Sequence, residues 1–315
     1  MKFPADMTRA TKGLPNYLDP LERLNQAKTA YVYLAPILLL LLVLIAYPVG
    51  YTAYLSVTDL ITDATGIALR FAGLRHYAAI LRDPLFLQIS GQTAHFTAVR
   101  VLSTLLLGLA TALVLNVGSL GSKIFRHIFL IPWALSHVVN ALMWKWMYNA
   151  DYGIVNEVLV RVGLIDHYRS WLSQPTTALY AVIFADVWKS VPFVTLMLLA
   201  ALQNVRRELY EAAMVDGASS VTSFFHVTLP SIRPVLLVTL ILQTMWAIKT
   251  FDLIWVLTQG GPVDSTLTLN VYAYQQAFSF LNLNYGAALS FVIAAIILFL
   301  SVVYVKSIGG EEVEG

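Results

Sequence analysis

The stretch EAAMVDGASSVTSFFHVTLPSIRP, residues 211–234, is a polar, small-residue-rich segment between two long apolar runs. Its first half places helix formers before Gly217, and a helix of about ten residues is marginal in water unless it lies against a surface. Gly217 permits a sharp reversal, because glycine adopts positive φ without steric cost. Phe224 and Phe225 then form an apolar patch before Pro230. The pattern predicts a short helix, a hinge and a second helix that protrude from an apolar body.

The rest of the chain has the composition of a membrane protein. Hydrophobic residues make up 58% and charged residues 12% of the 315 residues, whereas soluble domains carry about 25% charged residues. The apolar runs are long enough to cross a bilayer core of about 30 Å, which takes ~20 helical residues. Strand-sized alternating segments are not evident, which disfavours a barrel. The sequence therefore predicts an all-α, polytopic helical bundle in a membrane.

Hydropathy and charge predict the topology. More Lys and Arg residues fall on one side of the apolar runs than on the other, and the positive-inside rule places both termini and the 205–232 loop in the cytoplasm. We expect a cytoplasmic segment 1–30, a transmembrane domain 31–306 and a cytoplasmic acidic tail 307–315. The six predicted spans are Tyr31–Leu55, Gln92–Leu115, Phe125–Tyr148, Thr176–Ala201, Val235–Leu257 and Tyr285–Val305.

The opening segment carries a recognisable signature. Glu211-Ala212-Ala213 is followed after three residues by Gly217, and after nine more by Val227-Thr228-Leu229-Pro230. This resembles the EAA motif of the MalF-like permeases of bacterial carbohydrate ABC importers, with Val227 in place of Ile. The stretches AYPVGYTAYLS (46–56) and LTQGGPVDSTLTL (257–269) resemble the same branch. The resemblance implies the type I importer permease fold, with six transmembrane helices and a cytoplasmic coupling helix.

The resemblance also implies a division of labour between subunits. The coupling helix would dock into a cleft of a separate ATPase, with Glu211 paired to a basic residue there. The sequence has no G-x-x-x-x-G-K-[ST] motif that would cradle phosphates, so we expect no catalytic residue, metal ligand or bound cofactor in this chain; ATP and Mg²⁺ would be used by the ATPase. The expected coupling residues are Glu208, Glu211, Ala212, Ala213, Asp216, Gly217, Leu229 and Pro230.

The implied partners follow from the same resemblance. They are a second, homologous (MalG-like) permease, two ATPase subunits, an extracytoplasmic solute-binding protein and the lipid bilayer, with no nucleic acid. The expected location is the bacterial cytoplasmic (inner) membrane.

Four cations fall well inside the predicted spans, where ionisable groups are candidates for function. Lys145, near a span end, is expected to extend to the interface, whereas the role of Arg100 stays open. Lys189 and Lys249 each have a carboxylate three residues away, Asp186 and Asp252. Two interpretations remain: local pairs within each helix, or a pair between Asp186 and Lys249 across two helices near the midplane.

Helical spacing predicts a solute site on the fourth and fifth spans. Aromatic rings and amide, hydroxyl or carboxyl groups recur on one face of each, a mixture that suits carbohydrate, and transporters tend to bind solutes near the midplane. The predicted site residues are Asp186, Lys189, Ser190, Phe193, Gln243, Trp246, Lys249 and Thr250.

The function predicted from the sequence is therefore inward transport of a mono- or oligosaccharide by alternating access. Glycerol 3-phosphate, a glycerophosphodiester or a polyol remain alternative solutes. An ATP-independent secondary transporter is an alternative of another class, although we see no inverted repeat of the kind such transporters carry.

Overall fold

The computed structural model describes residues 20–63, 66–117 and 128–309, with side chains for 31–60, 68–117, 128–304 and 306. The expected segments 1–30 and 307–315 thus lie largely outside the described residues. The chain falls into two compact units, residues 1–54 and residues 55–315. The first contains α1 (Pro20–Leu41), a π-helical turn (Leu42–Ala46) and most of α2 (Tyr47–Ser56). Together these make one apolar helix that is long enough to cross a membrane.

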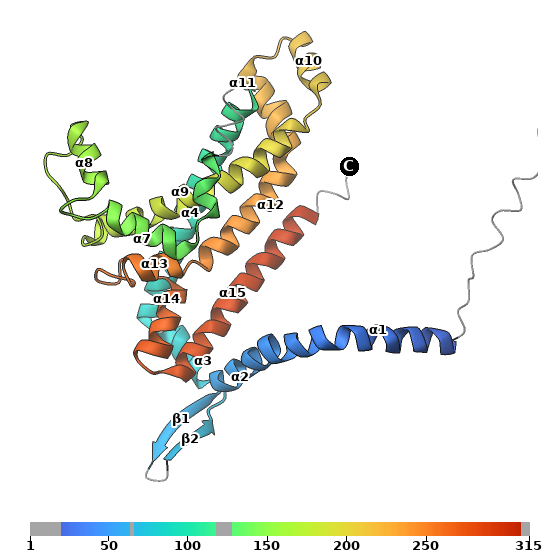
Figure 1. Ribbon diagram of the computed structural model, residues 1–315, viewed down its shortest axis with the longest axis vertical. Helices are drawn as coiled ribbons and strands as arrows, with labels where there is room; N and C mark the ends of the chain where they lie inside the picture. Colours follow the sequence, from blue (N-terminus) through green and yellow to red (C-terminus); the bar gives the residue numbers. More distant parts are fainter. Residues whose placement is uncertain (1–19, 64–65, 118–127, 310–315) are drawn as a thin grey trace, which may run out of the picture. The chain divides into compact units, whose positions relative to one another are not determined.

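The second unit is almost entirely helical (Figure 1). Its strands are β1 (Thr58–Asp63) and β2 (Gly66–Phe71). Its helices are α3 (Arg75–Arg82), α4 (Pro84–Asn116), α6 (Ile131–Ala134), α7 (His137–Met147), α8 (Ile154–Arg161), α9 (Pro175–Gln203), α10 (Arg207–Val215), α11 (Ser220–Ser223), α12 (Leu229–Ile248), α13 (Asp252–Leu257), α14 (Leu269–Tyr274) and α15 (Leu283–Gly309), with π-helical turns at Phe224–Thr228 and Gln275–Ser279.

Helices α4 and α9 form the centre of this unit. They approach closely at Gly108, where a Cβ would lie 2.5 Å from Cγ1 of Val194. A small residue at such a crossing lets the two helix backbones approach each other closely. Val194 and Leu198 are fully buried there, and α12 packs against both helices.

Within the described residues, five helices are long and apolar enough to cross a membrane. They are Tyr31–Ser56, Pro84–Asn116, Pro175–Gln203, Ser220–Ile248 and Leu283–Tyr304. Five of the six predicted spans therefore have a matching helix, and the count of six is not confirmed.

The prediction of a continuous helix over 125–148 is wrong within its described part. The chain forms α6, leaves helical geometry at Leu135 (ψ 144°) and Ser136 (ψ 156°), and then begins α7. The Ser136 side chain accepts a hydrogen bond from the Val139 amide, 3.2 Å away. Serine stabilises a new helix start in this way, and the largely apolar composition of this stretch concealed the break.

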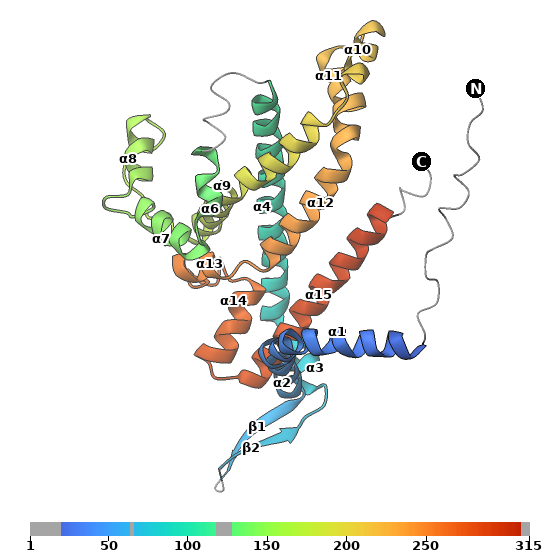
Figure 2. The same cartoon turned by 45° about the vertical axis from the view of Figure 1, so that its right-hand side comes forward.

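The predicted fifth span, 235–257, is also not one helix. Helix α12 ends at Ile248, the chain turns at 249–251, and α13 follows. The side-chain amide of Asn270 donates to the Ile248 carbonyl, which satisfies an acceptor left over at the helix end. Figure 2 shows α12 and α13 as separate elements.

Two connections have more structure than the sequence indicated. The region after α2 contains an antiparallel hairpin in which Thr58 pairs with Phe71 and Asp63 with Gly66, which was not predicted from the sequence; the fold remains helical as predicted. The segment 258–266 forms a tight turn, in which the Thr266 amide donates to the Gly260 carbonyl at 3.1 Å.

The N-terminal end of α4 is tied to two other helices by one carboxylate. Asp83 caps α4 by accepting from the Leu85 amide at 2.9 Å. It also accepts from the hydroxyls of Tyr272 (2.9 Å) and Tyr285 (3.0 Å). Although partial burial opposes the shift, the hydrogen bonds from Tyr272, Leu85 and Tyr285 hold the pKa of Asp83 below its usual value.

Candidate functional site

The EAA segment forms the helix, hinge and second helix that its sequence predicts. Helix α10 ends at Val215, and Gly217 takes φ +79°. The Gly217 amide donates to the Met214 carbonyl (3.0 Å) and the Ala218 amide to the Ala213 carbonyl (2.9 Å). These bonds form the Schellman arrangement, in which a glycine in the left-handed region closes the helix. Helix α10 lies at the end of the unit opposite the β1–β2 hairpin (Figures 1 and 2).

The α10 segment is largely exposed and carries apolar side chains on its surface. Among the predicted coupling residues, Ala213 and Leu229 are half-buried and the other six are exposed, including Glu208, Glu211 and Asp216. Met214 and Val215 are exposed as well. The Tyr210 hydroxyl and the Thr228 hydroxyl lie 2.9 Å apart and link α10 to the base of α12. A short helix held at its base with its outer face uncovered suits docking to a partner.

The predicted solute residues surround a cavity of about 320 Å³ between α4, α6, α9, α12 and α13. It lies at half the length of α9, since Lys189 is the middle residue of that helix. The cavity is lined by Arg100, Trp133, His137, Lys189, Ser190, Phe193, Trp246, Lys249, Thr250 and Asp252.

Arg100 is the centre of the polar wall of this cavity. Its guanidinium donates to Asp186 Oδ2 (3.2 Å), Ser190 Oγ (2.8 Å) and both the backbone and side-chain oxygens of Gln243 (2.8 and 2.5 Å). Arg100 is 2% exposed and Asp186 is 1% exposed. One side chain of α4 therefore connects α9 to α12, and a buried charge pair of this kind is retained because its hydrogen bonds are satisfied.

The ion pair in the structure is neither of the two arrangements left open by the sequence. Asp186 pairs with Arg100, not with Lys249 across the helices or with Lys189 in its own helix. The Thr250 hydroxyl, in the turn that follows α12, donates to this carboxylate at 3.5 Å. The prediction that Asp186 faces the end of α12 is correct, but the residue predicted to pair with it is not.

Aromatic rings form another wall of the cavity. The rings of Trp133 and Phe193 stack with centroids 5.7 Å apart and an interplanar angle of 25°. The rings of Phe193 and Trp246 lie 5.1 Å apart. Trp133 and Trp246 are each more than 40% exposed, so part of each ring remains open to a solute in this unit.

The remaining charged groups of the cavity are two lysines and one carboxylate. Lys189 is 7% exposed, and its Nζ donates to the Trp133 carbonyl at 3.1 Å. That carbonyl is available because α6 ends one residue later. Lys249 follows the C-terminus of α12 and Asp252 begins α13; both are exposed.

Six of the eight predicted solute residues line the cavity, and the other two, Asp186 and Gln243, are buried directly behind it. Sequence reasoning left Arg100 open and did not place Trp133, His137 or Asp252 in the site. An arginine in the middle of an apolar span was the available signal for Arg100. No local pattern marks Trp133, because it enters the site through the break after α6.

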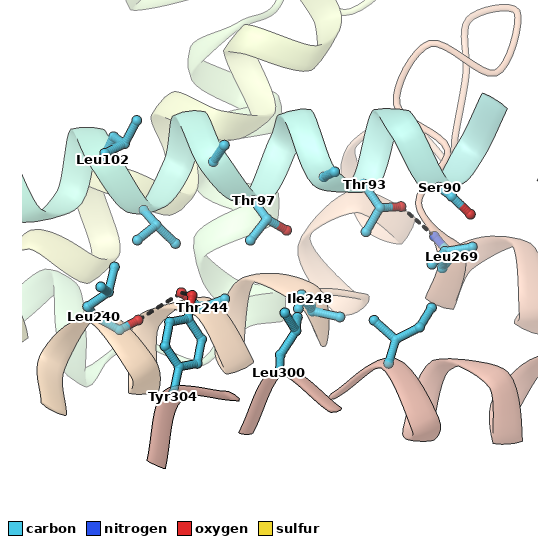
Figure 3. Close-up of a pocket in the computed structure, with 14 residues that line it drawn as sticks. Ser90, Thr93, Thr97, Leu102, Leu240, Thr244, Ile248, Leu269, Leu300 and Tyr304 are labelled. Atoms are coloured by element: carbon cyan, nitrogen blue, oxygen red, sulfur yellow. Dashed lines mark hydrogen bonds between the residues drawn. The ribbon is translucent and has the colours of Figure 1, made fainter. Parts of the chain in front are cut away.

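A second, larger cavity of about 540 Å³ lies between α4, α12 and α15 (Figure 3). Its walls are mostly apolar, with Leu240, Ile248 and Leu300 opposite small residues of α4. The hydroxyl of Thr93 accepts from the Leu269 amide at 3.0 Å. The polar atoms in the walls of this cavity are thus largely hydrogen-bonded within the protein. It offers far fewer groups to a polar solute than the cavity around Arg100.

Comparisons with known proteins identify the family of this chain. Residues 104–308 match the family described as "Binding-protein-dependent transport system inner membrane component". The chain is 39% identical to the trehalose/maltose transport system permease protein MalF of Thermococcus litoralis, over 93% of this chain and 98% of that protein. It is 38% identical to the sulfoquinovosyl glycerol transport system permease protein SmoG of Agrobacterium fabrum, over 94% and 95%.

A solved structure shares the fold. A chain from the crystal structure of a bacterial alginate ABC transporter, in complex with an alginate pentasaccharide-bound periplasmic protein, superposes with a TM-score of 0.76 at 20% identity, over 90% of this chain and 95% of that one. With the family match over most of the chain, the conclusion is direct. The protein is a multi-pass membrane permease of the binding-protein-dependent transport system inner membrane component family.

Proposed function

We propose that this chain is the permease subunit of an ATP-driven importer and that it moves a carbohydrate inward through the cavity around Arg100. The observation that carries the proposal is the combination of stacked aromatic faces with hydroxyl, amide and charged groups around one cavity at half the length of α9. Rings cover the apolar C–H face of a sugar, and polar groups match its hydroxyls. Relatives named for trehalose/maltose, sulfoquinovosyl glycerol and lactose transport support this solute class.

The coupling part of the proposal rests on α10. Its exposed apolar residues and the carboxylate of Glu211 would dock into an ATPase subunit on the cytoplasmic side, where ATP and Mg²⁺ are bound. A pair of ATPases, a second permease and an extracytoplasmic binding protein would complete the importer. Closure of the ATPases would move α10, and rigid-body motion of the helices would alternate access to the cavity.

The test is uptake by the complete importer in proteoliposomes. Labelled disaccharide should accumulate only with ATP on the cytoplasmic side and with the binding protein outside. Trp246→Ala should lower uptake while basal ATP hydrolysis and assembly persist, because the ring contacts solute and not the helix core. Trp146→Ala, which removes an exposed ring of α7 outside the cavity, is the matched control.

Two outcomes would contradict the proposal. Sugar uptake driven by an ion gradient without ATP would indicate a secondary transporter. Full uptake in the Trp246→Ala variant, at equal amounts of complex in the membrane, would show that the solute follows another path.

A further inference from the structure

The charges around the proposed solute cavity do not balance. Arg100 and Asp186 neutralise each other, and the three guanidinium nitrogens are all engaged by Asp186, Ser190 and Gln243. This pair therefore contributes little net charge toward a solute. The remaining charged groups that line the cavity are Lys189, Lys249 and Asp252, two cations against one carboxylate.

Lys189 is the most informative of these groups. An ammonium has three donors, and the hydrogen bond recorded for this one goes to a neutral backbone carbonyl, that of Trp133. Among the described residues, no carboxylate oxygen lies within 4 Å of its nitrogen, whereas Arg100 does have such a partner. The side chain is 93% buried, as the 7% exposed fraction implies. A buried cation is costly unless it is paired, so its position at a cavity wall leaves a place for an anion.

Lys249 adds a second cation on the opposite helix. It follows the last turn of α12 and is exposed to the cavity that Lys189 also lines. Asp252 begins α13 and has no ion pair with Lys249 within 4 Å in the described part of the chain. Phe193 and Trp246, whose rings are 5.1 Å apart, line the same cavity.

We infer that the solute is an anionic carbohydrate, a sugar that carries a carboxylate, sulfonate or phosphate group. The anionic group accepts hydrogen bonds from Lys189 and Lys249, and the sugar ring lies on Phe193 and Trp246. The Asp252 carboxylate accepts from sugar hydroxyls. This inference rests on the proposed function, since it names the solute class of the same cavity.

The experiment compares matched solutes in proteoliposomes that contain the complete importer. The probes are labelled methyl glucoside and maltose as neutral sugars, and methyl glucuronide, glucose 6-phosphate and 6-sulfo-6-deoxyglucose as anionic ones. Wild type should take up at least one anionic probe in preference to the neutral ones. Loss of one charge-assisted contact in Lys189→Met should weaken transport of that probe by about 10- to 150-fold, and Lys189→Arg should keep most of it.

Two further variants exclude a mere structural effect. Lys249→Met removes an exposed cation without disturbing buried packing and should also weaken anion transport. Lys145→Met is the control, because Lys145 likewise donates to a backbone carbonyl, that of Val256 at 3.2 Å, but does not line the cavity; its uptake should equal wild type.

The outcomes separate this inference from the proposed function. Uptake of neutral probes alone would overturn the anionic assignment and leave the carbohydrate importer standing. Wild-type transport of the anionic probe by Lys189→Met and Lys249→Met would also overturn it. Failure to transport any sugar, neutral or anionic, would contradict the proposed function and this inference with it.

Discussion

Replacing Arg100 with methionine should destabilise the protein more than any change on its surface. Arg100→Met keeps the volume of the side chain but leaves the Asp186 carboxylate buried at 1% exposure without its ion-pair partner. It also removes donors to Ser190 and Gln243. Removal of one partner of a buried pair costs about 3–5 kcal/mol, so the free energy of unfolding should fall by that amount.

The assay is a detergent titration of the purified chain in mixed micelles, with unfolding followed by tryptophan fluorescence. Asp186→Asn in the Arg100→Met background should recover part of the loss, because a neutral amide at 186 no longer requires a cation. The coupling energy between the two substitutions should be about 1–3 kcal/mol. Lys145→Met, which removes an exposed lysine, should change the free energy of unfolding by about 0.5 kcal/mol or less.

A strictly additive pair would refute the reasoning. If the double variant loses as much free energy of unfolding as the two single variants lose in sum, the two side chains are independent and the pair does not join α4 to α9. An Arg100→Met variant as stable as Lys145→Met would contradict it as well.

Three other predictions follow from particular contacts. Glu211→Lys on the exposed α10 should leave membrane insertion intact but uncouple ATP hydrolysis from uptake; normal uptake with normal ATPase association would refute a coupling role. Gly108→Val should destabilise the chain by about 1–3 kcal/mol, because a Cβ there lies 2.5 Å from Val194, and Val194→Ala should relieve part of this cost in the same titration. The pKa of Asp83 is lowered in the folded chain. The ionised carboxylate therefore stabilises the fold above the unfolded pKa, and this stabilisation is lost as pH falls through the folded pKa. Asp83→Asn should therefore flatten the fall in thermal stability on acidification that wild type shows, and an unchanged profile would contradict that assignment.

Much of the site could be predicted because helical period and depth are local properties of the sequence. The spacing of Asp186, Ser190 and Phe193 placed them on one side of α9, and all three are at or directly behind the cavity. The hinge at Gly217 was predictable for the same reason, since a glycine after a short run of helix formers closes a helix wherever it lies.

The rest depends on contacts between segments that are distant in sequence. The end of α12 at Ile248 is stabilised by Asn270, which no window around residue 248 contains. The partner of Asp186 is on α4, 86 residues earlier, and several cations were at suitable depth. The break at Leu135 and Ser136 brings the Trp133 carbonyl to Lys189, whereas hydropathy alone favoured an unbroken helix.

Because the sequence contains no cysteine, a single introduced thiol reports on the cavity of this chain directly. The decisive measurement is the rate at which a water-soluble thiosulfonate labels Lys249→Cys in the assembled importer, with and without saturating transported solute. Trp146→Cys, exposed but outside the cavity, serves as the reference. Solute should slow labelling at position 249 several-fold and leave position 146 unchanged. Equal labelling rates at position 249 with and without solute, in a complex that still transports, would contradict the claim that solute occupies this cavity.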